Sequence, residues 1–454
     1  MNRQTNHLQP LALPRTEVVG ENAFAGDLLF RKKLAERLTG YVDRLRVGAV
    51  LAIDAPWGEG KTWFGRNWAK HLEAQSHKII FIDAFAQDYV EDPFLLIAAE
   101  IAVVLDDGKG ASKKLRERAA DVMKAILPVG TKALINLAGR VALGSANLSE
   151  DVQEASKAAY EGAADSTDKW IEKKLEDQAL EKVSLVHFRN ELIKFAADQD
   201  KPVVIFIDEL DRCRPTFAVQ LVERIKHFFD VPNLVFVLLI NKKQLENAIK
   251  GVYGPETEAT TYLSKFVHLF LHLPKNISRD VNSYGHPTPV FIKDVLNRYD
   301  FNASQALLVK DFTDDFSQWV VSTNMSLRDI ERACALFVMS NVANTGFIAY
   351  IITLKIKYPT LYEELLRNEP SAHEKAISLL EPLIHKKNPA EMNWPDNYFK
   401  SIQELHKLQL GGDLTKDAPC FKEYGGRLFG WRGFSKEATF SDAFNLIDLP
   451  VENY

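Results

Sequence analysis

One short segment combines the residue types that are needed to bind a phosphate chain. Residues 55–62 have the sequence APWGEGKT and lie between an apolar run, residues 47–53, and a segment with helical periodicity. Gly58 and Gly60 would let backbone N–H groups wrap around phosphate oxygens, where a Cβ would block the turn. Lys61 would reach the β- and γ-phosphates from a helix N-terminus, whose dipole favours anions. This spacing predicts a nucleotide phosphate site.

The segment matches the P-loop pattern GxxxxGK[ST] except at its first position, where Ala55 replaces glycine. The Thr62 hydroxyl would bind Mg²⁺. The alternative, a glycine-rich turn that contains GKT by chance, fits poorly with a position between a strand and a helix. We expect eight consecutive residues to contact the nucleotide: Pro56, Trp57, Gly58, Glu59, Gly60, Lys61, Thr62 and Trp63.

Two acidic residues end a second apolar run. The sequence VVIFI at 203–207 leads into Asp208 and Glu209. Such a run could be a strand that ends in a solvated acidic turn, but together with the P-loop it predicts a Walker B strand. Asp208 would then hold Mg²⁺ through water, and Glu209 would orient or deprotonate the attacking water. We therefore predict Lys61 and Glu209 as catalytic residues, and Thr62 and Asp208 as the metal site.

Three further residues are candidates for catalysis, each with a structural alternative. Asn241 follows the apolar run 233–240 and would sense the γ-phosphate or the water, or would only form a turn. Arg212 would act as an arginine finger on a neighbouring subunit, or would pair with Asp211 and shape the loop. Arg328 would contact the phosphates, or would belong to a solvated helix face.

These residues need a scaffold that brings them together. Four apolar runs rich in Val, Ile and Leu are expected to be strands, and they cover residues 47–53, 78–82, 202–207 and 233–240. Runs without alternation are typical of strands that are buried on both faces and are therefore parallel. Helical segments separate the strands, which predicts a doubly wound α/β fold.

The long connection between the second and third strands divides the chain into regions. It is rich in Ala, Lys and Glu and is too long for an ordinary loop. We expect a flexible N-terminal arm at 1–20, a nucleotide-binding core at 21–91 and 200–275, a helical insertion at 92–199, a helical lid at 276–354, and a C-terminal region of unknown role at 355–454.

Composition and charge exclude several classes of protein. Three widely spaced cysteines among 454 residues exclude a disulfide scaffold. The net charge of −5 gives no overall field that attracts nucleic acid. The segment Tyr424–Phe434 interleaves arginine with aromatic residues, and it could stack on bases, bind a partner or form a packed hairpin. His268 and His272 lie in a predicted strand and lack the glutamate of a zinc helix, so we expect structural roles.

Two apolar segments are long enough to be considered as membrane spans. Residues 125–144 contain Lys132 and Arg140, which argue against a span. Residues 333–354 carry no charge, but polar residues and glycine at 340–346 predict a break between two buried helices. We expect no membrane span and a cytoplasmic protein.

Taken together, the motifs resemble the KAP family of P-loop NTPases. The resemblance covers residues 24–340 and follows the family's motif order. The matching segments are Asp27–Arg31, PWGEGKT at 56–62, Ala84-Phe85, IDELDRCRP at 207–215, Asn241–Ile249, Tyr262–Lys265, Leu273-Pro274 and Asn324–Arg332. The sequence departs from the family pattern at Ala55, Glu209, Asn241 and Ser264.

The resemblance implies an ATPase core of the ASCE type with a helical lid and an α-rich tail. It also implies a role in phage exclusion, because prokaryotic members occur in anti-phage systems, for example as the ATPase subunit of the Qat system. Self-association and co-encoded defence proteins would then be partners. We expect hydrolysis of Mg-ATP that drives conformational change or assembly, and we favour ATP over GTP because no NKxD motif is present. A nucleotide switch or scaffold without turnover, and a small-molecule phosphotransferase, are the alternatives.

Overall fold

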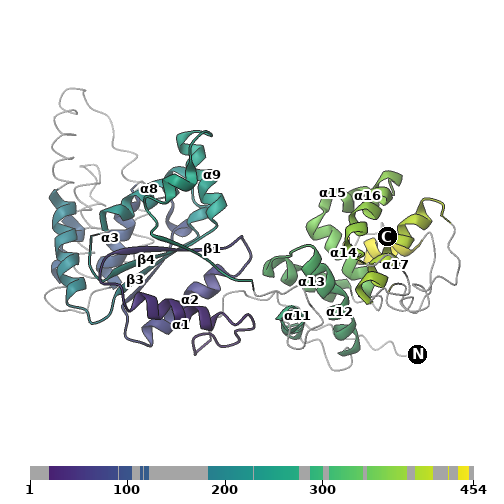
Figure 1. Ribbon diagram of the computed structural model, residues 1–454, viewed down its shortest axis with the longest axis horizontal. Helices are drawn as coiled ribbons and strands as arrows, with labels where there is room; N and C mark the ends of the chain where they lie inside the picture. Colours follow the sequence, from purple (N-terminus) through teal and green to yellow (C-terminus); the bar gives the residue numbers. More distant parts are fainter. Residues whose placement is uncertain are drawn as a thin grey trace, which may run out of the picture. The chain divides into compact units, whose positions relative to one another are not determined.

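The computed structural model describes most of the chain, and the described residues form two compact units (Figure 1). One unit ends at Pro274 and the other begins at Lys275. The described residues are 20–89, 92–104, 113–115, 117–121, 183–228, 230–275, 287–299, 306–340, 345–385, 394–412, 428 and 438–448. Most of the predicted N-terminal arm, much of the predicted insertion, and the segment Tyr424–Phe434 except Leu428 lie outside them.

The unit that ends at Pro274 is built on a five-stranded sheet with the order β2-β3-β4-β1-β5. Its strands are β1 (Ala49–Asp54), β2 (Ile79–Asp83), β3 (Val203–Asp208), β4 (Leu234–Ile240) and β5 (Leu269–His272). Every neighbouring pair is parallel. All residues of β3 and β4 are buried, as their unbroken apolar runs require. The predicted doubly wound α/β fold is confirmed.

Helices cover both faces of the sheet (Figure 1). Successive side chains of a strand point to opposite faces, so in β1 Val50 and Ala52 join one buried cluster while Leu51 and Ile53 join another. Helices α3, α8 and α9 pack in the first cluster, and α1 and α2 in the second. The helices are α1 (Lys32–Val42), α2 (Lys61–Glu73), α3 (Pro93–Val104), α8 (Pro215–Ile225), α9 (Lys242–Tyr253) and α10 (Ala259–Leu263).

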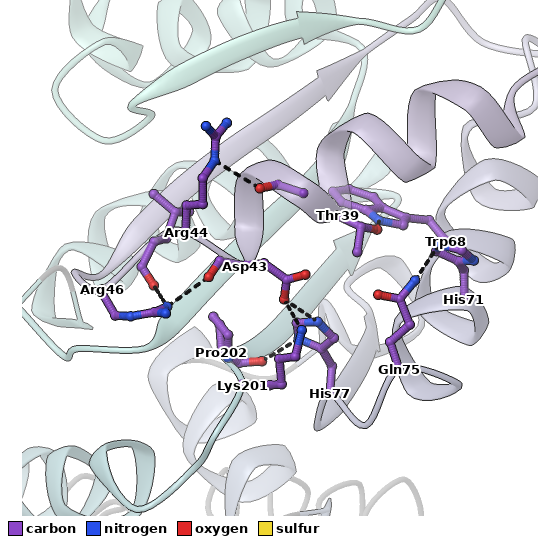
Figure 2. Close-up of polar contacts among 12 residues, drawn as sticks. Thr39, Asp43, Arg44, Arg46, Trp68, His71, Gln75, His77, Lys201 and Pro202 are labelled. Carbon is purple, nitrogen blue, oxygen red and sulfur yellow. Dashed lines mark hydrogen bonds and ion pairs between the residues drawn. The ribbon is translucent and has the colours of Figure 1, made fainter.

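A charged cluster fastens α1 to the amino ends of β2 and β3, as Figure 2 shows. The His77 Nδ1 lies 3.0 Å from the Pro202 carbonyl oxygen, and its Nε2 lies 3.1 Å from Asp43 Oδ1. The same Oδ1 lies 2.7 Å from Lys201 Nζ. The Asp43 carboxylate therefore lies between the His77 ring and the Lys201 ammonium. The cluster fixes the edge of the sheet that is opposite to the predicted active site.

The predicted elements form, and their ends differ by a few residues. Helix α2 begins at Lys61, within the P-loop motif. Helix α8 is followed by a 3₁₀ turn at Lys226–Phe228. In the described part of the insertion, α3 and residues 113–115, 117–121 and 183–197 are helical.

The unit that begins at Lys275 is helical throughout its described part. Its helices are α11 (Pro287–Asn297), α12 (Ala306–Ser322), α13 (Leu327–Ser340), α14 (Thr345–Lys357), α15 (Pro359–Leu366), α16 (Pro370–Leu380), α17 (Trp394–Gln409) and α19 (Ala438–Asp448). The apolar segment 333–354 is divided between α13 and α14, as predicted. Within the described ranges, no helix combines the length and apolar character needed to cross a membrane.

Buried polar groups join α12 and α14 to α17, which lies beyond the predicted boundary between the lid (276–354) and the C-terminal region (355–454). The Trp319 indole donates to the Tyr398 hydroxyl at 2.8 Å, and that hydroxyl donates to the Gly346 carbonyl at 2.6 Å. These groups are fully buried or nearly so, and a buried polar group without a partner would destabilise the fold. The helices on the two sides of this predicted boundary therefore share one core.

A second buried network contains two histidines. The Tyr350 hydroxyl lies 2.7 Å from His406 Nε2, and His406 Nδ1 lies 2.8 Å from His373 Nδ1. One arrangement of protons satisfies all these atoms: Tyr350 donates to His406, whose Nδ1–H donates to His373. Burial lowers the pKa of His406 well below its ordinary value, and neighbouring His373 lowers it further. The network is therefore built for neutral imidazoles.

This network predicts that the helical unit loses stability in mild acid. The unfolded chain takes up protons near pH 6.5, whereas folded His406 resists protonation, so the stabilisation is present above pH 6.5 and is lost as pH falls below it. We expect His406→Gln, which retains a hydrogen-bonding group, to show a smaller drop in melting temperature between pH 7.5 and 5.5 than the unmodified chain. Thermal melts at both pH values test this, and equal drops would contradict it.

Candidate active site

The sheet order places three predicted functional segments after three neighbouring strands. Strand β4 lies between β1 and β3, with Ile53 and Asp208 both opposite Leu239. The P-loop follows β1, Asn241 follows β4, and Asp208 ends β3. Parallel strands present their carboxyl ends at one edge, where ligands of open α/β sheets bind. The structure therefore brings these segments together.

The P-loop backbone needs glycine at two positions. Gly58 has a φ of 81° and Gly60 a φ of 73°, in the left-handed region that disfavours other residues. Ala55 is absent from the described residues with positive φ, is buried, and donates its N–H to the Ile240 carbonyl at 3.1 Å. Alanine therefore fits the first position of the motif without backbone strain.

Lys61 lies over the P-loop at the start of α2. Its Nζ donates to the Ala55 carbonyl at 2.8 Å and to the Pro56 carbonyl at 3.3 Å. Burial lowers the pKa of the Lys61 ammonium, and the carboxylates of Asp211, Asp208 and Asp54 oppose this shift. The side chain is a cation in an acidic surrounding, beside the loop whose N–H groups would hold phosphates.

The two residues of the predicted metal site are in contact. The Thr62 hydroxyl donates a hydrogen bond to the Asp208 carboxylate, which is almost completely buried. Burial raises the pKa of Asp208, while the bonds from Thr62 and from the Glu209 N–H, the latter at 2.8 Å, oppose the shift. Hydroxyl and carboxylate oxygens suit Mg²⁺, which keeps several waters and binds substrate phosphates. These residues therefore fit a magnesium ion.

Glu209 begins the turn after β3 in an unusual backbone conformation. Its φ of 59° and ψ of 20° lie in the left-handed region, which is uncommon for a residue other than glycine. The following residues, Leu210–Arg212, form a 3₁₀ turn. One carboxylate oxygen, Oε1, lies 3.0 Å from the Arg212 guanidinium. Such strain is found at functional sites, and here it sets the direction of a candidate catalytic carboxylate.

Trp57 connects the P-loop to this turn. Its indole N–H donates to the Asp211 carboxylate, and the ring is 45% exposed. Asp211 therefore bonds with Trp57, whereas the sequence alternative paired it with Arg212. Among the remaining predicted contact residues, Pro56 is exposed and Glu59 is buried. The Trp63 ring packs against Phe24, with 5.7 Å between the ring centroids.

Asn241 and Arg328 are placed on helices in different units. Asn241 caps α9, because its side-chain oxygen accepts the Gln244 N–H at 3.4 Å. It therefore has a structural role, although it also follows β4, the strand between the P-loop strand and the Asp208 strand. Arg328 is exposed on α13. That helix begins with a reciprocal cap between Ser326 and Asp329, with both bonds at 3.1 Å. Roles for Asn241 and Arg328 toward a phosphate stay predictions.

Comparison with known proteins identifies the family. The model for the KAP family P-loop domain matches residues 31–341. The chain belongs to the KAP family. The P-loop domain of this family implies nucleotide binding, in agreement with the glycine-dependent loop and the Thr62–Asp208 contact. The matched region, residues 31–341, nearly coincides with the predicted resemblance at residues 24–340.

The other comparisons do not extend the family assignment of this KAP protein. No curated protein matches the chain. One similar solved structure is described as the crystal structure of a DNA replication initiation factor. It is 12% identical with a TM-score of 0.32, and the match covers 95% of this chain and 96% of that one. A similarity of this size does not establish a shared fold or function.

Cys213, His268 and His272 have structural surroundings. Burial, followed by nearby acids, raises the pKa of the Cys213 thiol to about 12, so it is a poor nucleophile. His268 Nδ1 accepts the Val50 N–H at 3.0 Å, and His272 lies 3.9 Å from Asp54. Within the described ranges, no group of three or more His, Cys, Asp or Glu side chains could hold a metal.

A buried arginine beside the P-loop was not among the predicted site residues. Arg31 is 1% exposed, and it donates to the Gly60 carbonyl at 3.4 Å and to the Pro274 carbonyl at 3.5 Å. Burial lowers its pKa to about 10, opposed by the charges of Glu59 and Asp27, so it stays charged at neutral pH. Only the end of the resemblance segment Asp27–Arg31 pointed to this position.

Replacement of Arg31 is expected to destabilise the nucleotide-binding unit. Arg31→Met keeps most of the packing but leaves the buried Glu59 charge without this cation, which we expect to cost about 1–3 kcal/mol. Arg37→Met is the matched control, because Arg37 is exposed on α1, and surface changes stay within about 0.5 kcal/mol. Urea denaturation measures both, and equal midpoints would contradict the role of Arg31.

Proposed function

We propose that this KAP protein binds Mg-ATP and hydrolyses its β–γ phosphoanhydride bond. The observation that carries the proposal is the contact between the Thr62 hydroxyl and buried Asp208, with Glu209 next in the chain and the P-loop two strands away. An oxygen-ligand pair, a phosphate-binding loop and an adjacent carboxylate are the parts that nucleotide hydrolysis requires.

Each residue would have a defined task in that reaction. Backbone N–H groups of the loop would hold the phosphates, and Lys61 would offset charge on the β- and γ-phosphates. Thr62 and Asp208 would hold Mg²⁺, which would neutralise charge that develops on the phosphate oxygens. Glu209, aimed by its left-handed backbone, would orient the attacking water and accept its proton.

The first test measures phosphate release from ATP by the purified chain, with Mg²⁺ and with EDTA, beside direct ATP binding. Turnover that requires Mg²⁺ supports the proposal. Stoichiometric binding without release would indicate a nucleotide switch or scaffold. Transfer of labelled phosphate to a small-molecule acceptor would indicate a phosphotransferase. The last two outcomes would each overturn hydrolysis as the function.

We further propose that turnover drives a change of conformation or assembly in an anti-phage system, with co-encoded proteins as partners. This proposal is supported by the family resemblance, in which prokaryotic members such as the Qat ATPase subunit serve that role. Phage plating on cells that express the chain with its co-encoded partners tests it. Protection that is lost with Lys61→Ala supports the proposal, whereas protection by that variant would contradict a need for nucleotide. Light scattering with and without ATP tests self-association, and a monomer mass in both conditions would exclude it.

A further inference from the structure

We propose that Arg212 acts within its own subunit as the positioning residue of Glu209, rather than as an arginine finger for a neighbouring subunit. The inference rests on the proposed ATPase function and assigns one side chain of that site. It is carried by the geometry of the turn after β3. In this role Arg212 would not touch the substrate, and it would act through the carboxylate of Glu209.

The backbone of the turn brings the two side chains together. Because Glu209 is left-handed, the chain reverses at once, and the Arg212 N–H donates to the Glu209 carbonyl at 3.0 Å. The Arg212 guanidinium then lies 3.0 Å from Glu209 Oε1. The Cys213 thiol also bonds to the Glu209 carbonyl at 3.6 Å. Two hydrogen bonds to its carbonyl and one ion pair to its side chain thus hold Glu209, the residue that would activate water.

Other carboxylates lie close to the ion pair between Arg212 and Glu209. Asp208 and Asp211 flank Glu209 in the sequence, and Trp57 fixes the Asp211 carboxylate. Three carboxylates lie within four consecutive positions, and the Arg212 guanidinium contacts the second of them, Glu209. The Glu209 side chain is 17% exposed and that of Arg212 is 37% exposed. Such a pair contributes little to stability, so its main effect is to orient the carboxylate.

The same geometry argues against a role in a second subunit. A finger must reach the phosphates of a neighbour, but here the guanidinium is engaged with Glu209 of its own chain. To act in trans, Arg212 would have to release the carboxylate that activates water. Burial lowers the pKa of Lys61 in the same chain, and the charge of Arg212 adds to this shift.

The test compares Arg212→Met and Arg212→Lys with the unmodified chain. We expect Arg212→Met to lower kcat by about 10-fold or more while ATP affinity changes little. Arg212→Lys, which keeps a cation at this position, should restore part of kcat. Arg214→Met is the matched control, since Arg214 lies on the same loop as Arg212 but bonds to Asp88, which follows β2. An unchanged kcat in Arg212→Met would overturn the proposal.

A mixing experiment separates the two roles. Arg212→Met is mixed with Glu209→Gln, so that one subunit supplies an intact Glu209 and the other an intact Arg212. Activity that stays at the sum of the two variants supports positioning within one subunit, and activity that is restored would show a finger in trans and overturn it. If the unmodified chain binds ATP without turnover, the proposed function fails as well, and that result is distinct from a turnover that Arg212→Met leaves intact.

Discussion

Replacement of Glu209 with glutamine is expected to lower kcat for ATP hydrolysis by about 10²–10⁴-fold, the usual contribution of a general base. Glutamine keeps the size of the side chain and can adopt the same strained turn. It cannot accept the proton of the attacking water. Because Glu209 is separate from the Thr62–Asp208 pair that would hold the metal, ATP affinity should change by only a few-fold.

The measurement is steady-state phosphate release beside equilibrium ATP binding. Glu73→Gln is the control, because Glu73 is exposed at the end of α2 and its replacement removes the same charge. A Glu209→Gln variant with unchanged kcat would show that another group activates the water. A variant that no longer binds ATP would show that Glu209 supports the loop rather than the chemistry.

The sequence predicted the parts of this site that depend on local pattern. Buried strands appear as unbroken runs of Val, Ile and Leu, and the P-loop appears as glycines at fixed spacing before a helix. Gly58 and Gly60 do have the left-handed backbone that such spacing demands. Thr62 and Asp208 come together because the P-loop follows β1 and Asp208 ends β3, and the carboxyl ends of these strands share one edge of the sheet.

Features that depend on distant contacts were not predictable in this way. Arg31 is held by Pro274, which lies 243 residues further along the chain, and no local pattern distinguishes it from an exposed arginine. The pairing of Arg212 with Glu209 depends on the left-handed turn at Glu209, which is rarely adopted by glutamate. His373 and His406 lie 33 residues apart, and only packed helices bring them together.

Gly65 is a further position whose role becomes visible only in the structure. It lies in the interior of α2, where glycine is normally less favourable than alanine by about 1 kcal/mol. A Cβ built at Gly65 would lie 2.2 Å from Leu239 Cδ1 and 3.3 Å from its Cγ. Leu239 is completely buried in β4, the strand between the P-loop strand and the Asp208 strand. Helix α2 therefore approaches the sheet at this glycine.

Gly65→Ala is expected to destabilise the nucleotide-binding unit by about 1–3 kcal/mol, because overpacking outweighs the gain in helix propensity. The identical change at Gly40, in α1, has the opposite expected sign, since nothing lies within 4 Å of its added Cβ. Denaturation midpoints in urea measure both variants. Because α2 begins at Lys61, a helix displaced by the added methyl group would also move the phosphate loop, and ATP affinity should fall with stability. If both alanine variants were equally stable, the close packing of α2 on β4 would be refuted. If Gly65→Ala lost stability but kept full ATP affinity, the loop would be held independently of its helix, most directly by the bond from Ala55 to Ile240.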